Sequence, residues 1–261
     1  MDFISIYMMK IGVGITTFNK QDYYKQLYDS LPYSKIDHLI TTNMGDKYED
    51  NYSESEWNQW TQEDDLGPAH GRNQNIEYLY DKGCDYIFLI EDDMVIKSPD
   101  VFDTYIDYSI TTGIKYFIYC STTDGAGTPG NRTPKLKVKY PDDMGVWLYP
   151  NMNNDFVCHH RSNFDERKYD ISYRYIFDIE LTYYHTFEKQ ITSPFWWFAD
   201  IENSDKYVNN QPESTSRINE QREKKLLDEF TRLQKQYGYW VNNIPQKSQR
   251  EVLDRLKQLK P

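Results

Sequence analysis

Residues 86–93 read YIFLIEDD, an unbroken run of five apolar or aromatic residues followed directly by three acids. A short apolar run without alternation is typical of a strand that is buried on both faces of a parallel sheet. Ligands of open α/β sheets bind outside the carboxyl ends of such strands, which is where the three acids stand. The stretch therefore predicts an α/β fold with a ligand site at Glu91, Asp92 and Asp93.

The sequence on either side of this stretch alternates between strand-like and helix-like patterns. The expected strands are 11–18, 36–41, 86–90, 116–120, 146–149 and 156–158, and the expected helices are 21–31, 69–82, 101–110 and 179–188. Residues 43–65 are expected to form a loop with a short helix around Trp57 and Trp60, and 121–135 form a second expected loop. The alternation through residue 120 predicts a Rossmann-like, mainly parallel sheet flanked by helices.

The net charge of -11 is unevenly distributed along the 261 residues. Residues 214–261 contain 11 Lys and Arg against 6 Asp and Glu, whereas the rest of the chain contains 19 against 35. We expect an α/β domain at 9–205 and a basic helical extension at 206–261. The extension is either a solvated helical face, which is the commoner case, or a contact for an anionic partner such as a membrane surface or DNA.

Cysteine usage and hydropathy indicate the expected location of the protein. The three cysteines stand far apart and beside apolar runs, which predicts neither a disulfide framework nor a zinc site. No apolar run reaches the length of about 18 residues that a transmembrane helix needs. Residues 1–7 lack the basic leader of a signal peptide. We therefore expect a cytoplasmic protein.

Three adjacent acids at the end of a buried strand repel one another and lose hydration, so they need an opposite charge. A hard divalent cation with oxygen ligands, Mn²⁺ or Mg²⁺, supplies that charge and keeps positions open for phosphate oxygens. A solvated acidic turn is the alternative interpretation. The position directly after a buried strand favours the metal.

Four segments together resemble one known family. Residues 88–96 resemble the DXD-type motif of GT-A glycosyltransferases in a Glu-Asp-Asp form, and residues 12–19 resemble the first strand and turn of family-2 members. Residues 67–75 are similar to their Ala-Arg-Asn helix start, and residues 163–181 resemble their Gly-Phe-Asp-Glu-Arg segment with the acids that follow it. The resemblance implies a GT-A fold, Mn²⁺ or Mg²⁺, and a nucleotide-sugar donor, with a UDP-sugar as the first choice.

The resemblance also implies roles for individual residues. Asp93 matches the direct metal ligand, and Glu91 and Asp92 would act through water or on the donor. Asp178 occupies the place of the general base of inverting members, with Glu180 as the runner-up and a helix cap as the structural alternative. The family's late metal-binding histidine has its best match at His185, although a helical histidine more often packs. The expected donor contacts are completed by Thr16, Thr17, Phe18, Asn19, Asn43, Arg72 and Asn73.

The sequence leaves both the nucleotide and the acceptor open. The second expected strand ends in Thr41, Thr42 and Asn43, where the family has an acidic pair that reads the nucleobase. The expected acceptor is a glycan or lipid-linked sugar, and a modified base in DNA is the alternative, as in some bacteriophage enzymes. In that alternative, the extension and a loop with Arg132, Lys135, Lys137 and Lys139 would contact phosphates.

Two further function classes compete with a glycosyltransferase. A non-catalytic carbohydrate-binding protein with the same shell is one of them, and the intact acidic triplet argues against it. A nucleotidyltransferase is the other. Enzymes of that class usually have a Gly-rich phosphate loop after the first strand, and residues 16–19 do not form one.

Overall fold

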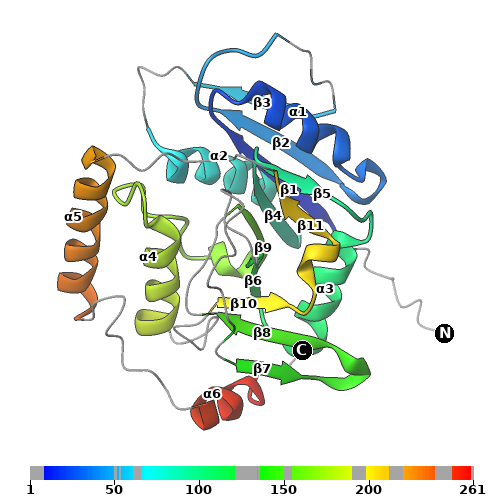
Figure 1. Ribbon diagram of the computed structural model, residues 1–261, viewed down its shortest axis with the longest axis vertical. Helices are drawn as coiled ribbons and strands as arrows, with labels where there is room; N and C mark the ends of the chain where they lie inside the picture. The colour runs from blue at the N-terminus through cyan, green and yellow to red at the C-terminus, as the bar shows by residue number, and fades with distance from the viewer. Residues whose placement is uncertain are drawn as a thin grey trace.

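The computed structural model describes residues 9–49, 52, 54–60, 66–120, 134, 136–149, 155–189, 198–211, 220–238 and 249–259. Its centre is a six-stranded sheet in the order β3-β2-β1-β4-β9-β6 (Figure 1). The strands are β1 Ile11–Thr17, β2 His38–Asn43, β3 Glu56–Gln59, β4 Tyr86–Glu91, β6 Tyr116–Ile118 and β9 Phe156–His160. β1 is parallel to both of its neighbours, β2 and β4, and β9 is antiparallel to β4 and β6. The mainly parallel sheet expected from the sequence is confirmed.

Helices cover both faces of this sheet. They are α1 Gln21–Ser30 and α3 Val101–Thr112 on one face, and α2 Pro68–Asp81 and α4 Phe177–Tyr183 on the other. Phe88 and Ile90 of β4 pack with α1 and α3, whereas Ile87 and Leu89 pack with α2 and α4. Because successive strand residues point to opposite faces, burial on both faces explains why the run at 86–90 contains no polar residue.

Two small sheets border the central one, in the orders β10-β8-β7 and β11-β5. Their strands are β5 Met94–Ile96, β7 Leu136–Lys139, β8 Gly145–Tyr149, β10 Phe198–Ile201 and β11 Val208–Asn210. Short 3-10 helices are found at Tyr33–Lys35, Pro141–Asp143, Arg161–Phe164 and Ser204–Lys206. β11 follows the expected domain boundary at 206, and it pairs with β5, which begins directly after the acidic triplet.

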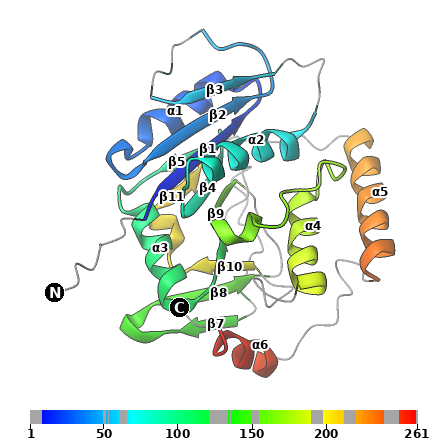
Figure 2. The same ribbon diagram turned by 180° about the vertical axis from the view of Figure 1, so that it is seen from behind.

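The two C-terminal helices pack against the rest of the molecule. α5 Glu220–Tyr237 lies beside α4, and α6 Gln249–Leu256 lies beside β7 (Figures 1 and 2). Leu233 of α5 is buried in the cluster of α2 and α4, and Leu256 of α6 is buried in the cluster of α1 and α3. No helix among the described residues is long and apolar enough to cross a membrane.

Two expected elements differ from the structure. The short helix expected around Trp57 is wrong, because residues 56–59 form β3, which pairs in parallel with the edge of β2. That pairing sets Trp57 opposite Thr41 and stacks its ring on Tyr52, with ring centroids 5.8 Å apart. The helix expected at 179–188 begins earlier, at Phe177, and continues as a π-helix at Tyr184–Lys189. The loop expected at 121–135 lies outside the described residues except for Pro134.

Candidate active site

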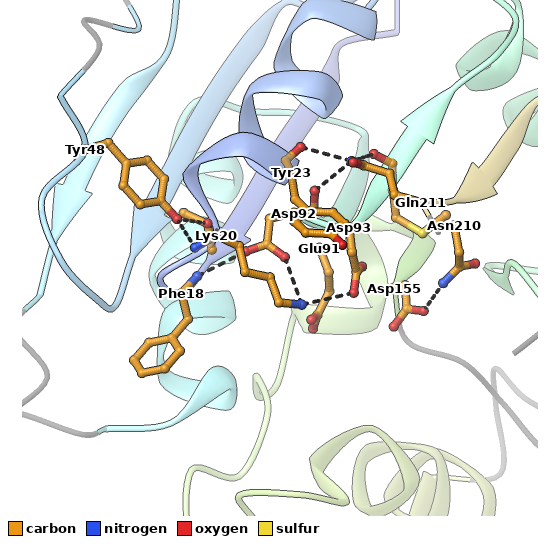
Figure 3. Close-up of polar contacts among 12 residues, drawn as sticks. Phe18, Lys20, Tyr23, Tyr48, Glu91, Asp92, Asp93, Asp155, Asn210 and Gln211 are labelled. Atoms are coloured by element: carbon orange, nitrogen blue, oxygen red, sulfur yellow. Dashed lines mark hydrogen bonds and ion pairs between the residues drawn. The ribbon is translucent and has the colours of Figure 1, made fainter. Parts of the chain in front are cut away.

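The carboxyl ends of β1, β2 and β4 meet at one edge of the sheet. The parallel register sets Thr17 beside Asn43 and Thr16 beside Glu91, so the polar residues that follow all three strands come together. Figure 3 shows the acidic triplet at this edge, below the first turn of α1. Asp92 and Asp93 are 4% and 8% exposed, which makes this a largely buried acidic cluster.

Asp92 joins the end of β4 to the end of β1. Its Oδ2 accepts hydrogen bonds from Thr17 Oγ1 at 2.7 Å and from the Phe18 amide at 3.2 Å. The Thr17 hydroxyl also contacts the Tyr48 hydroxyl. Burial raises the pKa of Asp92 to about 7, and the nearby Lys20 ammonium opposes that shift. Asp92 therefore orders the β1 turn.

Lys20 supplies a positive charge directly at the triplet. Its Nζ lies 3.5 Å from Asp93 Oδ2 and 3.8 Å from Asp92 Oδ1. The side chain stays 30% exposed, and the ammonium also lies 5.6 Å from the centroid of the Tyr23 ring. Burial lowers the pKa of Lys20, but the negative charges of Asp92, Asp93 and Glu91 outweigh it, so the net shift is upward.

Asp155 is a fourth carboxylate at the site that the sequence analysis missed. It immediately precedes β9, and its backbone carbonyl accepts a hydrogen bond from the Glu91 amide at 2.7 Å. Its Oδ2 accepts a hydrogen bond from Asn210 Nδ2 at 2.7 Å. Burial, followed by the negative charges of Asp93 and Glu91, raises the pKa of Asp155 to about 8. The antiparallel pairing of β9 with β4 sets Phe156 opposite Ile90 and so brings Asp155 to Glu91, and no sequence signal indicates this pairing.

Gln211 supports the acidic turn from a distant part of the chain, 119 residues beyond Asp92. Its backbone N–H donates to the Asp93 backbone carbonyl at 2.6 Å. Its side-chain Nε2 lies within hydrogen-bond distance of the carbonyls of Asp92, Met94 and Tyr23, at 3.1, 2.8 and 2.9 Å. Gln211 is 2% exposed, so these contacts fix the backbone of the triplet against α1 in a buried setting (Figure 3).

Arg72 connects the triplet to α4. It lies in the second turn of α2, where its guanidinium is 1% exposed and lies 5.3 Å from the centroid of the Phe177 ring. Its Nη2 donates to Glu91 Oε1 at 2.8 Å, and its Nη1 donates to Asp178 Oδ1 at 3.2 Å. Both terminal nitrogens of the guanidinium are thus engaged by carboxylates, and the donor-binding role of Arg72 stays a prediction.

Asp178 is the second residue of α4 and does not cap the helix, since the cap position is Ile176. Its side chain is fully buried. Burial raises the pKa of Asp178 to about 7, while the Arg72 charge and a hydrogen bond from Tyr169 favour the ionised form. The result is a carboxyl group poised to exchange a proton near neutral pH.

Glu180 is engaged on both of its carboxylate oxygens. Oε2 pairs with Arg167, and Oε1 accepts a hydrogen bond from the Tyr237 hydroxyl at 2.9 Å. Since Tyr237 is the last residue of α5, Glu180 ties α4 to the C-terminal helix. Its predicted role as an alternative base has to be weighed against this structural role.

Glu229 of α5 makes a second tie to α4 that the sequence did not indicate. Its carboxylate accepts hydrogen bonds from the amides of Arg174, Tyr175 and Ile176, at 2.7, 2.8 and 3.2 Å. These amides directly precede α4, where backbone donors lack intrahelical partners and a negative charge is favoured. The helix that carries Asp178 is thus held in place by α5.

Three residues predicted to contact the nucleotide-sugar donor make hydrogen bonds within the protein near the strand ends. Asn43 is fully buried and bonds to the backbone of Gly45 and Asp46. Asn19 has a φ of 53°, and its Oδ1 accepts a hydrogen bond from the Asp46 amide at 2.6 Å. A Cβ at Gly45 would lie 2.1 Å from that same oxygen, which explains the glycine. Thr16 is buried and accepts a hydrogen bond from Asn75.

The remaining predicted residues lie apart from one another. Phe18 lies at the end of β1, where its ring is 50% exposed. Asn73 makes two hydrogen bonds to the backbone of Tyr169 and so fastens α2 to the segment before α4. His185 is buried next to the ring of Tyr184 and close to His159, whose pKa is lowered first by burial and then by the charge of His185. Its role as a metal ligand stays a prediction.

The chemistry of the donor set fits a hard cation that is shared with a bound ligand. Every candidate ligand at the triplet is a carboxylate oxygen, which is the ligand type that Mg²⁺ and Mn²⁺ prefer. Within the described parts of the chain, no three His, Cys, Asp or Glu side chains converge as a self-sufficient metal site requires. Mg²⁺ is usually held by one or two carboxylates together with water and substrate phosphates, and Asp93 with Asp155 nearby suits that arrangement.

Comparisons with known proteins identify the fold. No family model and no curated protein matches the sequence. The structure is similar to that of TarS from S. aureus, with a TM-score of 0.58 at 10% identity over 96% of this chain and 43% of that one. A shorter form, TarS 1-349, gives a TM-score of 0.54 at 10% identity over 95% of this chain and 69% of that one. This chain therefore spans less than half of the longer TarS structure, and the likeness establishes the GT-A fold.

A third match is weaker. A mannosyltransferase from Pyrobaculum calidifontis, in complex with GDP-Man and Mn²⁺, gives a TM-score of 0.46 at 8% identity. The match covers 68% of this chain and 52% of that one. Similarity at this level carries no weight for the residues of the site.

Proposed function

We propose that this chain is a metal-dependent, inverting glycosyltransferase that moves a sugar from a nucleotide-sugar donor to an acceptor hydroxyl. One observation carries the proposal: Arg72 links the buried carboxyl of Asp178 to the acidic triplet at the carboxyl ends of the GT-A strands. A candidate base and a candidate donor site therefore share one ion-pair network. The resemblance in sequence favours a UDP-sugar as the donor.

Asp178 is the proposed general base. A sugar hydroxyl is almost fully protonated at neutral pH, so it attacks the anomeric carbon efficiently only if a carboxylate takes its proton during the attack. As the new bond to the acceptor oxygen forms, the bond between the anomeric carbon and the diphosphate breaks and the nucleoside diphosphate leaves. The pKa of Asp178, about 7, matches the requirement that a base be ionised and still accept a proton near neutral pH.

Asp93 is the proposed metal ligand, and Asp155 is the neighbouring carboxylate that supports it. Bound Mn²⁺ or Mg²⁺ would neutralise negative charge that develops on the departing diphosphate. Asp92 holds the β1 turn through Thr17 and Phe18 and so shapes the same site. The exposed ring of Phe18 lies at this turn and offers a flat surface on which a nucleobase or sugar can stack.

A glycan or lipid-linked sugar is the proposed acceptor. Part of the charge that the DNA alternative relies on is engaged within the protein. Lys137 lies 4.0 Å from the centroid of the Trp147 ring, Lys139 pairs with Glu202, and Arg232 lies over Tyr173. Arg132 and Lys135 lie outside the described residues. The contacts of α5 with α4 likewise give α5 a structural role that requires neither a membrane nor DNA.

The direct test measures donor binding and turnover separately. Isothermal titration with UDP and other nucleoside diphosphates, with and without Mn²⁺, identifies the nucleotide. Hydrolysis of the matching nucleotide sugar then provides a turnover assay that needs no known acceptor. We expect Asp93→Ala to lose metal-dependent nucleotide binding, whereas Asp178→Asn keeps that binding and loses transfer to any acceptor found. Full transfer activity in Asp178→Asn would overturn the base assignment.

A further inference from the structure

Lys20 places its ammonium beside the two carboxylates, Asp92 and Asp93, at which a metal ion would be expected to bind. The residue lies in the turn between β1 and α1, and its ammonium lies between the carboxylates of Asp92 and Asp93 (Figure 3). Its backbone is fixed, because its amide donates to the Tyr48 hydroxyl at 3.0 Å and its carbonyl accepts from the Tyr24 amide at 2.9 Å. The side chain is a flexible four-carbon stem that carries a compact charge and remains 30% exposed.

The ammonium and a divalent cation compete for the same oxygen. Lys20 Nζ is 3.5 Å from Asp93 Oδ2, and Asp93 is the proposed metal ligand. A divalent ion bound to Asp93 and the ammonium of Lys20 would lie close together and repel each other, unless a further anion is bound near both of them. Arg72 is already bonded to Glu91 and Asp178, so among the cations described here Lys20 is the one whose charge faces the Asp92–Asp93 pair.

We infer that Lys20 is a built-in counter-ion that couples metal binding to donor binding. Without a donor, its ammonium occupies the Asp92–Asp93 pair and keeps a free divalent ion weakly bound. When the ion arrives with a nucleoside diphosphate, the ammonium turns from Asp93 to the diphosphate oxygens, and both cations then have an anionic partner. This inference rests on the proposed function, because it takes Asp93 as the metal ligand.

The coupling also accounts for the arrangement of the acids. Carboxylates arranged around an ammonium do not converge as they would around a small divalent ion, and no three metal-binding side chains converge among the residues that the structure describes. The site is therefore completed only when the diphosphate supplies further oxygens and draws Lys20 away. The consequence is that the ion and the nucleotide bind together much more tightly than either binds alone.

The experiment compares Lys20→Met with wild-type protein by isothermal titration and by the electron paramagnetic resonance signal of free Mn²⁺. Methionine keeps much of the length of the lysine stem and removes its charge. We expect Lys20→Met to bind Mn²⁺ alone about tenfold more tightly and to bind UDP in saturating Mn²⁺ about tenfold more weakly, within the usual range of coupling between sites. Lys20→Arg keeps the charge and is expected to follow the wild type.

Lys25→Met is the matched control, because Lys25 lies on the exposed side of α1, the helix that follows Lys20, in an ion pair with Asp29. It is expected to leave both affinities unchanged. Circular dichroism verifies that each variant is folded, and Lys20→Gln replaces Lys20→Met if the latter is not. Unchanged or weaker Mn²⁺ binding in the neutral variant, while wild type still binds UDP with Mn²⁺, overturns the inference and leaves the proposed function intact. A wild type that binds no Mn²⁺ with any nucleotide overturns both.

Discussion

Arg72 and Asp178 form a buried ion pair across 3.2 Å, with side chains that are 1% and 0% exposed. The other arm of the guanidinium holds Glu91 at 2.8 Å, so one arginine connects the end of a central strand to the start of the helix that carries the candidate base. A buried pair is weak evidence for stability, but removing one partner leaves an uncompensated charge. The pair is therefore a sensitive point for both stability and acid-base chemistry.

Arg72→Met is expected to lower the free energy of unfolding by about 3–5 kcal/mol, because it leaves the Asp178 and Glu91 carboxylates without their cation. Since the Arg72 charge lowers the pKa of Asp178, the same change raises that pKa further above its usual range. Urea unfolding measures the first effect. The double variant Arg72→Met with Asp178→Asn is the control and should recover part of the lost stability, and equal loss in both would contradict the ion-pair account.

Turnover is expected to depend on pH through Asp178. Its pKa is about 7 in the folded protein, so the carboxyl is increasingly protonated below that pH and cannot accept a proton. The value of kcat/KM should therefore rise with pH and level off above about 7. A pH-rate profile of donor turnover checks this expectation. A profile that stays flat from about pH 5 to about pH 9 would exclude Asp178 as the base.

Asp155→Asn tests whether the fourth carboxylate belongs to the metal site. The substitution keeps the shape of the side chain but removes a carboxyl group that interacts with Asp93 and Glu91 and that could ionise to bind a cation. We expect the affinity for Mn²⁺ in the presence of UDP to fall about tenfold, a change of about 1.4 kcal/mol. Asp165→Asn is the matched control, because Asp165 is exposed and accepts a hydrogen bond from the Tyr80 hydroxyl. Equal affinities in the two variants would remove Asp155 from the site.

Glu229→Ala tests the attachment of α5 to α4, the helix that carries the candidate base Asp178. Three backbone amides before α4 lose their acceptor, so we expect the free energy of unfolding to fall by about 1–3 kcal/mol. Hydrogen exchange at residues 174–176 should accelerate before exchange in the central sheet does. The neighbouring Asp228→Ala, at an exposed position on the same helix, serves as the control. Unchanged exchange at those amides would mean that α5 does not hold α4.

The parts of the site that lie close in sequence were predictable. Residues 86–93 combine a buried strand with three acids, and both features depend on the local pattern alone. Arg72 and Asp178 followed from ordered matches to one family, although the ion pair between them depends on how α2 and α4 pack. The sequence could not show that the pKa of Asp178 is raised, since burial is the main cause and arises from tertiary contacts.

The features that were missed depend on long-range pairing. Asp155 reaches Glu91 because β9 enters the sheet antiparallel to β4, an arrangement that no local pattern specifies. The strand at Trp57 likewise forms on the open edge of β2, where pairing overrides a helix-like composition. Gln211 and Glu229 both lie within the expected extension at 206–261, and only the fold reveals that their side chains turn inward.

The contacts of Gln211 determine when the acidic turn can reach its final conformation during synthesis. Its side chain closes on the Asp92 carbonyl from 119 residues further along the chain. At translation rates of roughly 5–20 residues per second, the acidic turn leaves the ribosome roughly 6–24 seconds before Gln211. During that interval the nascent chain carries adjacent carboxylates on a turn that β11 has not yet secured. The acidic turn can thus be secured only after residue 211 has been synthesised, and a chain released before that point would carry the three acids without the contacts that hold their backbone.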